Sequence, residues 1–187
     1  MLKIVTMKKI VFFLIVLVSS CSIQVNGYSD DFNKVSVENK AKIVELKSFE
    51  ALSRDYIYKI SGKQLRAELS KHDKSIVYVF KNGCTSDYCK PMMHYETYAK
   101  KNGYQLFLVM NGYAHLDDTL GQRNSFESPL YVINTNYYQN RIRATYTKLF
   151  LQDVLAIQSG KEIPENGNIY IFEGDVLIKE TRELPQY

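Results

Sequence analysis

The sequence predicts an α/β domain, and three features of the chain carry this prediction. Residues 74–80 (KSIVYVF) and 104–110 (YQLFLVM) are almost wholly apolar, which is typical of parallel strands buried on both faces. Between them, residues 91–103 (PMMHYETYAKKNG) begin with proline and end with glycine, as helices often do. Residues 168–181 place the turn EGD between two alternating apolar runs, which predicts a β-hairpin.

The first half of the domain predicts a strand, a helix and then a βαβ unit. Residues 55–61 (DYIYKIS) indicate a short strand. Residues 62–73 (GKQLRAELSKHD) indicate an amphipathic helix with Leu65 and Leu69 facing inward. The strands at 74–80 and 104–110 are then joined by a helix. A right-handed crossover makes these two strands parallel neighbours.

The second half predicts a helix, two hairpins and a further helix. Residues 115–126 (HLDDTLGQRNSF) favour a helix. Residues 129–133 (PLYVI) and 141–147 (RIRATYT) read as strands joined by a polar turn. Residues 148–160 (KLFLQDVLAIQSG) predict a helix that ends at its glycine. The hairpin at 168–181 is the last predicted element.

The N-terminus has the features of a secretory signal. Lys8 and Lys9 precede an apolar run over residues 10–18, and small residues follow up to Cys21. The run is shorter than the roughly 20 apolar residues that a membrane-spanning helix needs. The ending LVSSC resembles the lipobox of bacterial lipoproteins, whose cysteine becomes the lipidated first residue. This resemblance implies a signal peptide over residues 1–20 and a lipid on Cys21 that anchors the protein in the bacterial cell envelope.

The rest of the chain fits one domain on a tether. Residues 22–40 mix Ser, Asn, Asp and Gly without apolar periodicity, so we assign residues 21–52 to a tether and lead-in segment, and 53–187 to the domain. Losing residues 1–20 removes three lysines and no acid, so the net charge falls from +4 to +1. A chain that is nearly neutral has no strong field to attract nucleic acid, and none is expected as a partner.

Cys84 and Cys89 are the candidate reactive residues. If Cys21 carries a lipid, they are the two remaining cysteines, and in an oxidising envelope such a pair is a disulfide candidate. A sulfur at a helix N-terminus has a lowered thiol pKa, because unpaired backbone N–H groups lie there. We assign Cys84 as the attacking thiolate and Cys89, inside the first turns of the helix, as the resolving one. Lys81 adds nearby positive charge.

At this point the order of elements, over about residues 55–158, resembles the thioredoxin fold. The resemblance implies a three-layer sandwich with a central mixed sheet flanked by helices, to which the hairpin at 168–181 is an addition. In that family a cis proline precedes the third core strand and faces the reactive cysteine. Pro129, in Ser128-Pro129-Leu130, stands in that place. The resemblance therefore implies that Pro129 belongs to the site.

The spacing of the two cysteines differs from that of thioredoxins, which place two residues between them. Here four residues intervene, and two helical positions five apart lie roughly 8 Å from each other. A disulfide requires Cα atoms closer than about 7 Å. Either Cys84 therefore stays outside the helix, or the first turn unwinds on oxidation.

Two other thioredoxin-fold families share part of the pattern. Gly83-Cys84-Thr85 with a second cysteine five positions on resembles bacterioferritin-comigratory-protein peroxiredoxins. In those enzymes a threonine and a proline stand where this chain has Lys81 and Val77, so peroxidase activity is not expected. Sco copper chaperones use Cys-x-x-x-Cys-Pro and a distant histidine, which His115 would supply, with a spacing that differs by one.

These features predict a lipid-anchored monomer that exchanges thiols and disulfides with protein substrates and needs no cofactor. Cys84 would form a mixed disulfide and Cys89 would resolve it. The alternative is a non-catalytic binding or structural lipoprotein in which Cys84 and Cys89 form an inert disulfide. The reduction potential of the pair separates the two readings.

Overall fold

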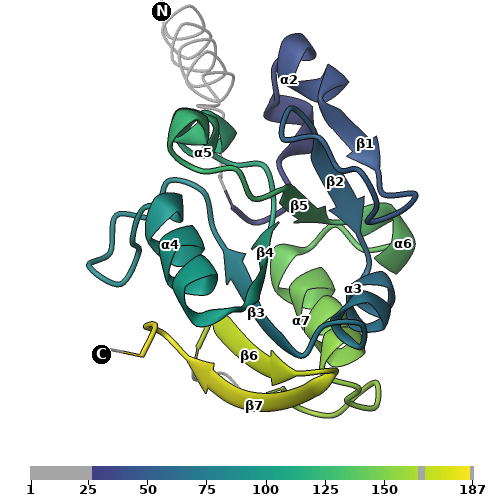
Figure 1. Ribbon diagram of the computed structural model, residues 1–187. Helices are drawn as coiled ribbons and strands as arrows, with labels where there is room; N and C mark the ends of the chain where they lie inside the picture. The colour runs from purple at the N-terminus through teal and green to yellow at the C-terminus, as the bar shows by residue number, and fades with distance from the viewer. Residues whose placement is uncertain (1–26, 164–166, 186–187) are drawn as a thin grey trace, which may run out of the picture.

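A computed structural model describes residues 27–163 and 167–185 as one α/β unit (Figure 1). The predicted signal peptide and Cys21 lie outside the described residues. No described helix is both long and apolar enough to cross a membrane. In chain order the elements are η1 (Phe32–Lys34), α2 (Val37–Ala41), β1 (Ile43–Glu45), β2 (Ile57–Ile60), α3 (Gly62–Leu69), β3 (Lys74–Phe80), α4 (Met92–Asn102), β4 (Gln105–Met110), α5 (Leu116–Leu120), η2 (Arg123–Ser125), β5 (Leu130–Ile133), α6 (Thr135–Tyr138), α7 (Arg143–Val154), β6 (Ile169–Glu173) and β7 (Val176–Thr181).

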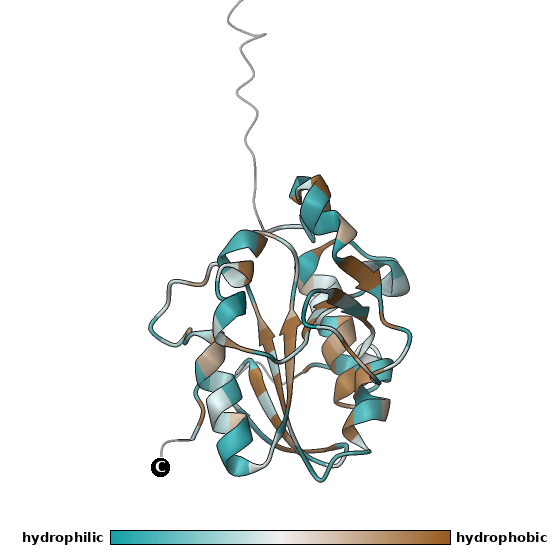
Figure 2. Cartoon of the chain, turned by 45° about the horizontal axis from the view of Figure 1, so that its top comes forward, coloured by the Kyte–Doolittle hydropathy of each residue, from teal (hydrophilic) through white to brown (hydrophobic). Residues whose placement is uncertain are grey.

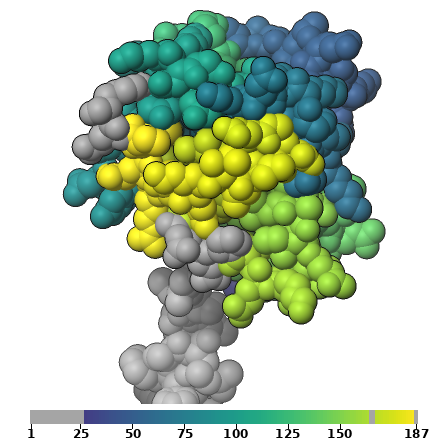
Figure 3. Space-filling view, turned by 60° about the horizontal axis from the view of Figure 1, so that its bottom comes forward, coloured from purple at the N-terminus to yellow at the C-terminus, as the bar shows by residue number. Residues whose placement is uncertain are grey.

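The strands form one seven-stranded mixed sheet in the order β1-β2-β5-β4-β3-β6-β7. The five strands from β1 to β3 in that order are parallel, while β6 runs antiparallel to β3 and β7 antiparallel to β6. The predicted βαβ unit is confirmed, because β3 and β4 are parallel neighbours joined through α4. The predicted C-terminal hairpin is confirmed as β6 and β7, which lie side by side across the face shown in Figure 3.

Helices cover both faces of the sheet, and the alternation of side chains along each strand divides the core in two. In β3, Tyr78 and Phe80 face α4 and α5, while Val77 and Val79 face α3 and α7. Figure 2 shows the apolar strands in the middle and polar residues on the outer sides of the helices. The α/β class with a mixed sheet between helices is therefore as predicted.

The helices that flank the sheet begin and end as their sequences favour. Ser61 and Gln64 form a capping box at the start of α3. Pro91 is the N-cap residue of α4, and Gly103 ends that helix with φ of 71°, a conformation that costs glycine little. The boundaries of α4 thus follow directly from the proline and glycine that predicted it.

The predicted hairpin over residues 129–147 is wrong. After β5 the chain forms α6, and α7 then runs from Arg143 instead of starting at residue 148. Tyr146, Phe150 and Val154 lie on one side of a helix and are fully buried, whereas Ile142 is 41% exposed. Helical spacing thus buries more apolar surface than strand alternation would. The helix also ends at Val154 and not at Gly160.

From Gly27 onward the segment assigned to the tether packs against the domain. The carboxylate of Asp31 is buried and accepts hydrogen bonds from the backbone N–H of Gly27 (2.8 Å) and from Arg143 on α7 (3.3 Å). The Lys34 ammonium lies 2.8 Å from the same carboxylate. The backbone N–H of Tyr113, just after β4, donates to the Asp30 carbonyl. This N-terminal segment, residues 27–35, is therefore held at the carboxyl edge of the parallel strands.

Candidate functional site

Cys84 and Cys89 form a disulfide in the loop between β3 and α4. Their Cα atoms lie 6.0 Å apart, within the range that a disulfide allows. Cys84 is exposed and Cys89 is partly buried. The pairing inferred from the cysteine count is therefore present in the structure.

Both cysteines lie outside the helix. Of the two alternatives given by the cysteine spacing, the one in which Cys84 stays outside the helix is the one observed, and it allows the 6.0 Å separation of the Cα atoms. The prediction that Cys89 lies in the first turns is wrong, because Pro91 caps α4 and helical residues begin at Met92. The backbone of Pro91 is extended, with φ of −56° and ψ of 149°, so the segment that carries Cys89 precedes the helix and is not part of it.

A buried asparagine fixes the first half of the loop. Asn82 is 2% exposed, and its side-chain amide donates to the carbonyl of Gly112 after β4 (2.9 Å). The Thr119 hydroxyl of α5 donates to the Asn82 side-chain oxygen (2.7 Å). The chain next to Cys84 is thus attached to two neighbouring elements.

A tyrosine and a glutamine fix the second half. The backbone N–H of Lys90, next to Cys89, points to the hydroxyl of Tyr95 at 3.5 Å. The Tyr95 ring is buried and stacks on Tyr78, with ring centroids 4.0 Å apart. The N–H of Met92 donates to the Gln122 side chain (3.0 Å). Both ends of the loop are therefore held on the core, while its middle is exposed.

Gly83 is the tightest point of the loop, and its replacement yields a prediction. A Cβ on Gly83 would lie 2.6 Å from the Asp118 carboxylate and 2.8 Å from the His115 Cβ, at φ of 65°. Gly103 has a similar φ of 71° but open space around it. Gly103→Ala should therefore cost about 1–2 kcal/mol from backbone strain alone. Gly83→Ala should cost a further 1–3 kcal/mol, roughly, from the contacts, measured by urea unfolding. Equal losses in the two variants would contradict this reading of the loop.

The disulfide borders a cleft of about 540 Å³. Lys81, Asp118 and Gln122 contribute its polar groups, and Pro91 and Met93 contribute apolar surface. Lys90 also lines it, and its ammonium donates to the Asp87 carbonyl within the loop (2.7 Å). The predicted electrostatic partner Lys81 thus lies in the same cleft as Cys84.

Pro129 is not beside the cysteines. It precedes β5, which lies two strands away from β3 in the sheet, and it is not among the residues that line the cleft at Cys84. The strand antiparallel to β3 is β6, and Asn168 before it reaches the cysteine edge, where its carbonyl accepts from Val79. No described peptide bond is cis. The expected cis bond and the expected approach of Pro129 to Cys84 therefore do not occur in this fold.

The structure brings His115 to the site but shows no metal centre. His115 packs against Gly83, next to Cys84, and its ring lies 3.9 Å from the Asp118 carboxylate. No group of three or more potential ligands occurs among residues 27–163 and 167–185. His94, on α4, is not among the residues that line this cleft and lies in a second groove.

Sequence reasoning missed the residues that hold the loop. Asn82 carries a recognisable signal, since a polar residue directly after a buried strand must satisfy its hydrogen bonds if it stays inside. Tyr95 and Gln122 carry none, because their partners come from other elements. Glu96 was also missed: its carboxylate accepts from the Ser128 side chain and from the N–H groups of Glu127 and Ser128. It attaches α4 to the segment before β5.

The fold and the site define an α/β protein with a surface disulfide at the carboxyl edge of its sheet. No family model matches the chain, and no curated protein and no solved structure matches it either.

Proposed function

We propose that the chain exchanges thiols and disulfides with protein substrates through Cys84 and Cys89. The observation that carries this proposal is the exposure of the Cys84 end of the disulfide at the mouth of a cleft. A disulfide that undergoes exchange must be accessible to a thiolate that approaches along the S–S axis, whereas a structural disulfide has no such requirement. The thioredoxin-like character of the fold is part of the same proposal and rests on the βαβ unit that carries the cysteines.

The reaction balances without a cofactor. A substrate thiolate attacks the Cys84 sulfur, the Cys84–Cys89 bond breaks, and Cys89 leaves as a thiolate. A second substrate thiolate then attacks the substrate sulfur of the mixed disulfide and releases Cys84. The substrate loses two electrons and two protons and gains a disulfide, while the protein ends as the dithiol. The reverse sequence reduces a substrate disulfide.

The surroundings assign the two sulfurs different roles. Cys84 is the more exposed and lies beside Lys81 and His115, so a substrate reaches it first. Cys89 is partly buried against the start of α4, where the dipole of an eleven-residue helix favours a thiolate. Cys89 is thus the better leaving group during attack on Cys84, and the resolving thiol in the reverse direction.

Single serine variants test the assignment. Cys89→Ser should accumulate mixed disulfides with substrate proteins, because the resolving thiol is gone, whereas Cys84→Ser should accumulate few. The measurement is non-reducing electrophoresis after acid quenching, with the chain in its natural compartment. Equal trapping by the two variants would contradict the roles assigned here. Each variant also loses the cross-link, which should cost a similar 2 kcal/mol or so, and the two therefore serve as stability controls for each other.

The reduction potential separates exchange from a structural disulfide. Exchange proteins have potentials of about −270 to −120 mV, whereas structural disulfides lie below about −300 mV. We expect the Cys84–Cys89 pair in the first range. A value below about −300 mV would leave the non-catalytic reading, a tethered binding or structural protein with the same fold.

We infer in addition that the protein is a lipid-anchored monomer of the bacterial envelope. The inference rests on the signal-like N-terminus and on the cysteine at the end of LVSSC. Feeding cells with labelled palmitate should label the wild-type chain and leave Cys21→Ser unlabelled. Label that persists in Cys21→Ser would overturn the anchor.

A further inference from the structure

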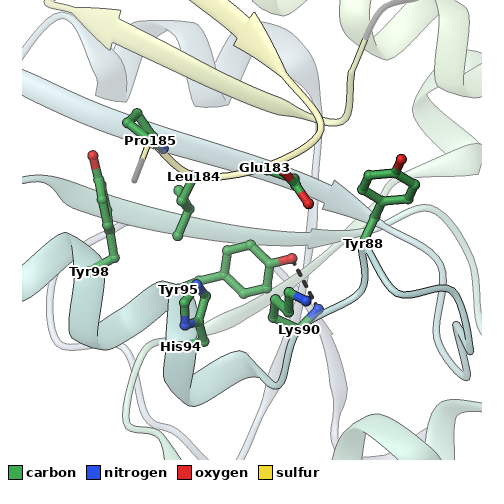
Figure 4. A pocket seen from close by; sticks show the side chains of 8 residues that line it. All are labelled: Tyr88, Lys90, His94, Tyr95, Tyr98, Glu183, Leu184 and Pro185. Atoms are coloured by element: carbon green, nitrogen blue, oxygen red, sulfur yellow. Dashed lines mark hydrogen bonds between the residues drawn. The ribbon is translucent and has the colours of Figure 1, made fainter. Parts of the chain in front are cut away.

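A second hollow adjoins the disulfide loop, between α4 and the C-terminal segment that follows β7. It measures about 400 Å³, and Figure 4 shows its walls. Tyr95 and Tyr98 come from α4, Tyr88 stands across the opening from them on the cysteine loop, and Leu184 and Pro185 close the remaining side. We call this hollow the tyrosine groove.

The chain shows what the tyrosine groove accepts, because its own C-terminal segment lies along one wall. Leu184 is 8% exposed and packs into the same core cluster as Tyr95 and Tyr98. In Figure 4 its side chain lies between those two rings, and Pro185 continues beside Tyr98. A Leu-Pro segment of the chain itself therefore already lies against these tyrosine rings.

The rest of the groove is open on the side of the disulfide. Tyr88 is 53% exposed, although a tyrosine ring on a loop would gain from packing. Tyr88 and Lys90 are the two chain neighbours of Cys89, so the groove and the reactive sulfurs share one loop. Lys90 lines both the groove and the cleft at Cys84. A segment lying in the groove is thus within a few residues of the disulfide, at about 3.3 Å per extended residue.

We propose that the tyrosine groove is the subsite for an extended, proline-containing apolar segment of the substrate protein, next to the substrate cysteine that attacks Cys84. Aromatic-lined grooves bind polyproline-type segments because these are already extended and lose little entropy on docking. Lys90, His94 and Glu183 at the rim provide polar groups for the backbone of such a segment. This inference rests on the proposed exchange function and names its substrate class.

Two peptide thiols test the inference on the oxidised protein, with Cys21 replaced by serine so that only the described pair reacts. One peptide carries Leu-Pro-Gly before its cysteine and the other Gly-Ser-Gly. Mass spectrometry after acid quenching measures the initial rate at which each forms a disulfide with Cys84. We expect the Leu-Pro peptide to react about tenfold faster, since partial burial of one leucine contributes on the order of 1.4 kcal/mol.

Two matched tyrosine variants test whether the faster reaction of the Leu-Pro peptide depends on the tyrosine groove. Tyr88→Ala should bring the ratio of the two rates close to one. Tyr137→Ala removes a tyrosine of similar exposure, 47%, on the distant helix α6, and should leave the ratio unchanged. Both side chains are exposed, so neither variant is expected to unfold the chain.

The possible results separate a failure of the proposed subsite from a failure of the proposed exchange function. If both peptides open the disulfide at the same rate, the subsite is wrong and exchange stands. If neither peptide reacts while a small dithiol reduces the pair only under denaturing conditions, the exchange function itself fails. A preference that survives Tyr88→Ala overturns the tyrosine groove as its source. A preference that appears only after removal of Gln186 and Tyr187 assigns the groove to the chain's own end and overturns the inference.

Discussion

Replacing Asp31 by alanine is expected to lower the free energy of unfolding by about 3–5 kcal/mol, because it leaves a buried arginine without its counter-ion. The Asp31 carboxylate is 1% exposed, and the Arg143 side chain 11%. The loss also removes the acceptor for the Gly27 N–H and the partner of Lys34. Urea unfolding followed by circular dichroism measures the change.

The matched control is an ion pair of similar length on the surface. Glu38 on α2 and Lys42, the C-cap residue of that helix, lie 3.0 Å apart, and the glutamate side chain is 81% exposed. Glu38→Ala should cost less than about 0.5 kcal/mol, because water screens such pairs. Comparable losses in Asp31→Ala and Glu38→Ala would show that the N-terminal segment adds little to the stability of the domain.

Replacing Glu96 by glutamine is expected to lower the free energy of unfolding by about 2–4 kcal/mol at neutral pH. Burial alone would raise the pKa of this carboxyl. The hydrogen bonds from the Ser128 side chain and from the N–H groups of Glu127 and Ser128, with Lys100, outweigh burial and hold the pKa below its usual value. Glutamine keeps the shape but loses the charge that these donors stabilise.

The loss should depend on pH in one direction. Because the folded state lowers the pKa of Glu96, the folded state favours the ionised form, and its contribution is complete well above the unfolded pKa of about 4.3. It declines as the pH falls through that value toward the lower folded pKa. The difference between wild type and Glu96→Gln should therefore be constant from about pH 6 to 8 and shrink as the pH falls below 4.3 or so.

A neighbouring carboxylate provides the control for this prediction. Glu127 is 62% exposed and pairs with Arg54 at the surface, so Glu127→Gln should have a small effect at every pH. A difference between wild type and Glu96→Gln that grows toward acid pH would contradict the assigned charge state. Parallel unfolding curves at several pH values provide the measurement.

The centre of the fold could be predicted because its signals are local. The strands β3 and β4 are continuous apolar runs, and α4 lies between a proline and a glycine at the positions where they end helices. The hairpin of β6 and β7 has its turn glycine at Gly174, with φ of 56°. Each of these elements is specified by residues within its own bounds.

Helix α7 could not be predicted because its sequence fits two periods. Ile142, Ala144 and Tyr146 alternate as a strand would, while Tyr146, Phe150 and Val154 recur every four residues. The second pattern extends further and meets the apolar face of α3, so the helix buries more surface. Only the partner element decides between the two readings.

Contacts between distant residues account for the remaining errors. A stretch rich in Asp, Ser and Asn is typical of a tether unless its charges find buried partners. The partner of Asp31 is Arg143, which lies 112 positions along the chain. The position of Pro129 likewise depends on where β5 lies in the sheet relative to β3, which the order of elements leaves open.

The disulfide of the candidate site was predicted from the sequence, but the surfaces around it were not. Counting cysteines predicted the pair, and the helix behind it was recognised from Pro91. The tyrosine groove could not be predicted, because one wall belongs to α4 and another to a segment about ninety residues further along the chain, at Leu184. Such a surface exists only when the sheet brings β6 and β7 next to β3.

If Cys21 carries the proposed lipid, the attachment of Asp31 to α7 would limit the distance between the domain and the bilayer. Cys21 and Gly27 are six positions apart, and a fully stretched chain of that length spans about 20 Å. A lipid on Cys21 would therefore keep the carboxyl edge of the sheet, where both the N-terminal segment and the cysteine loop lie, close to the headgroups. Soluble proteins far from the surface would be out of range, and the accessible clients would be membrane proteins or chains emerging from the bilayer.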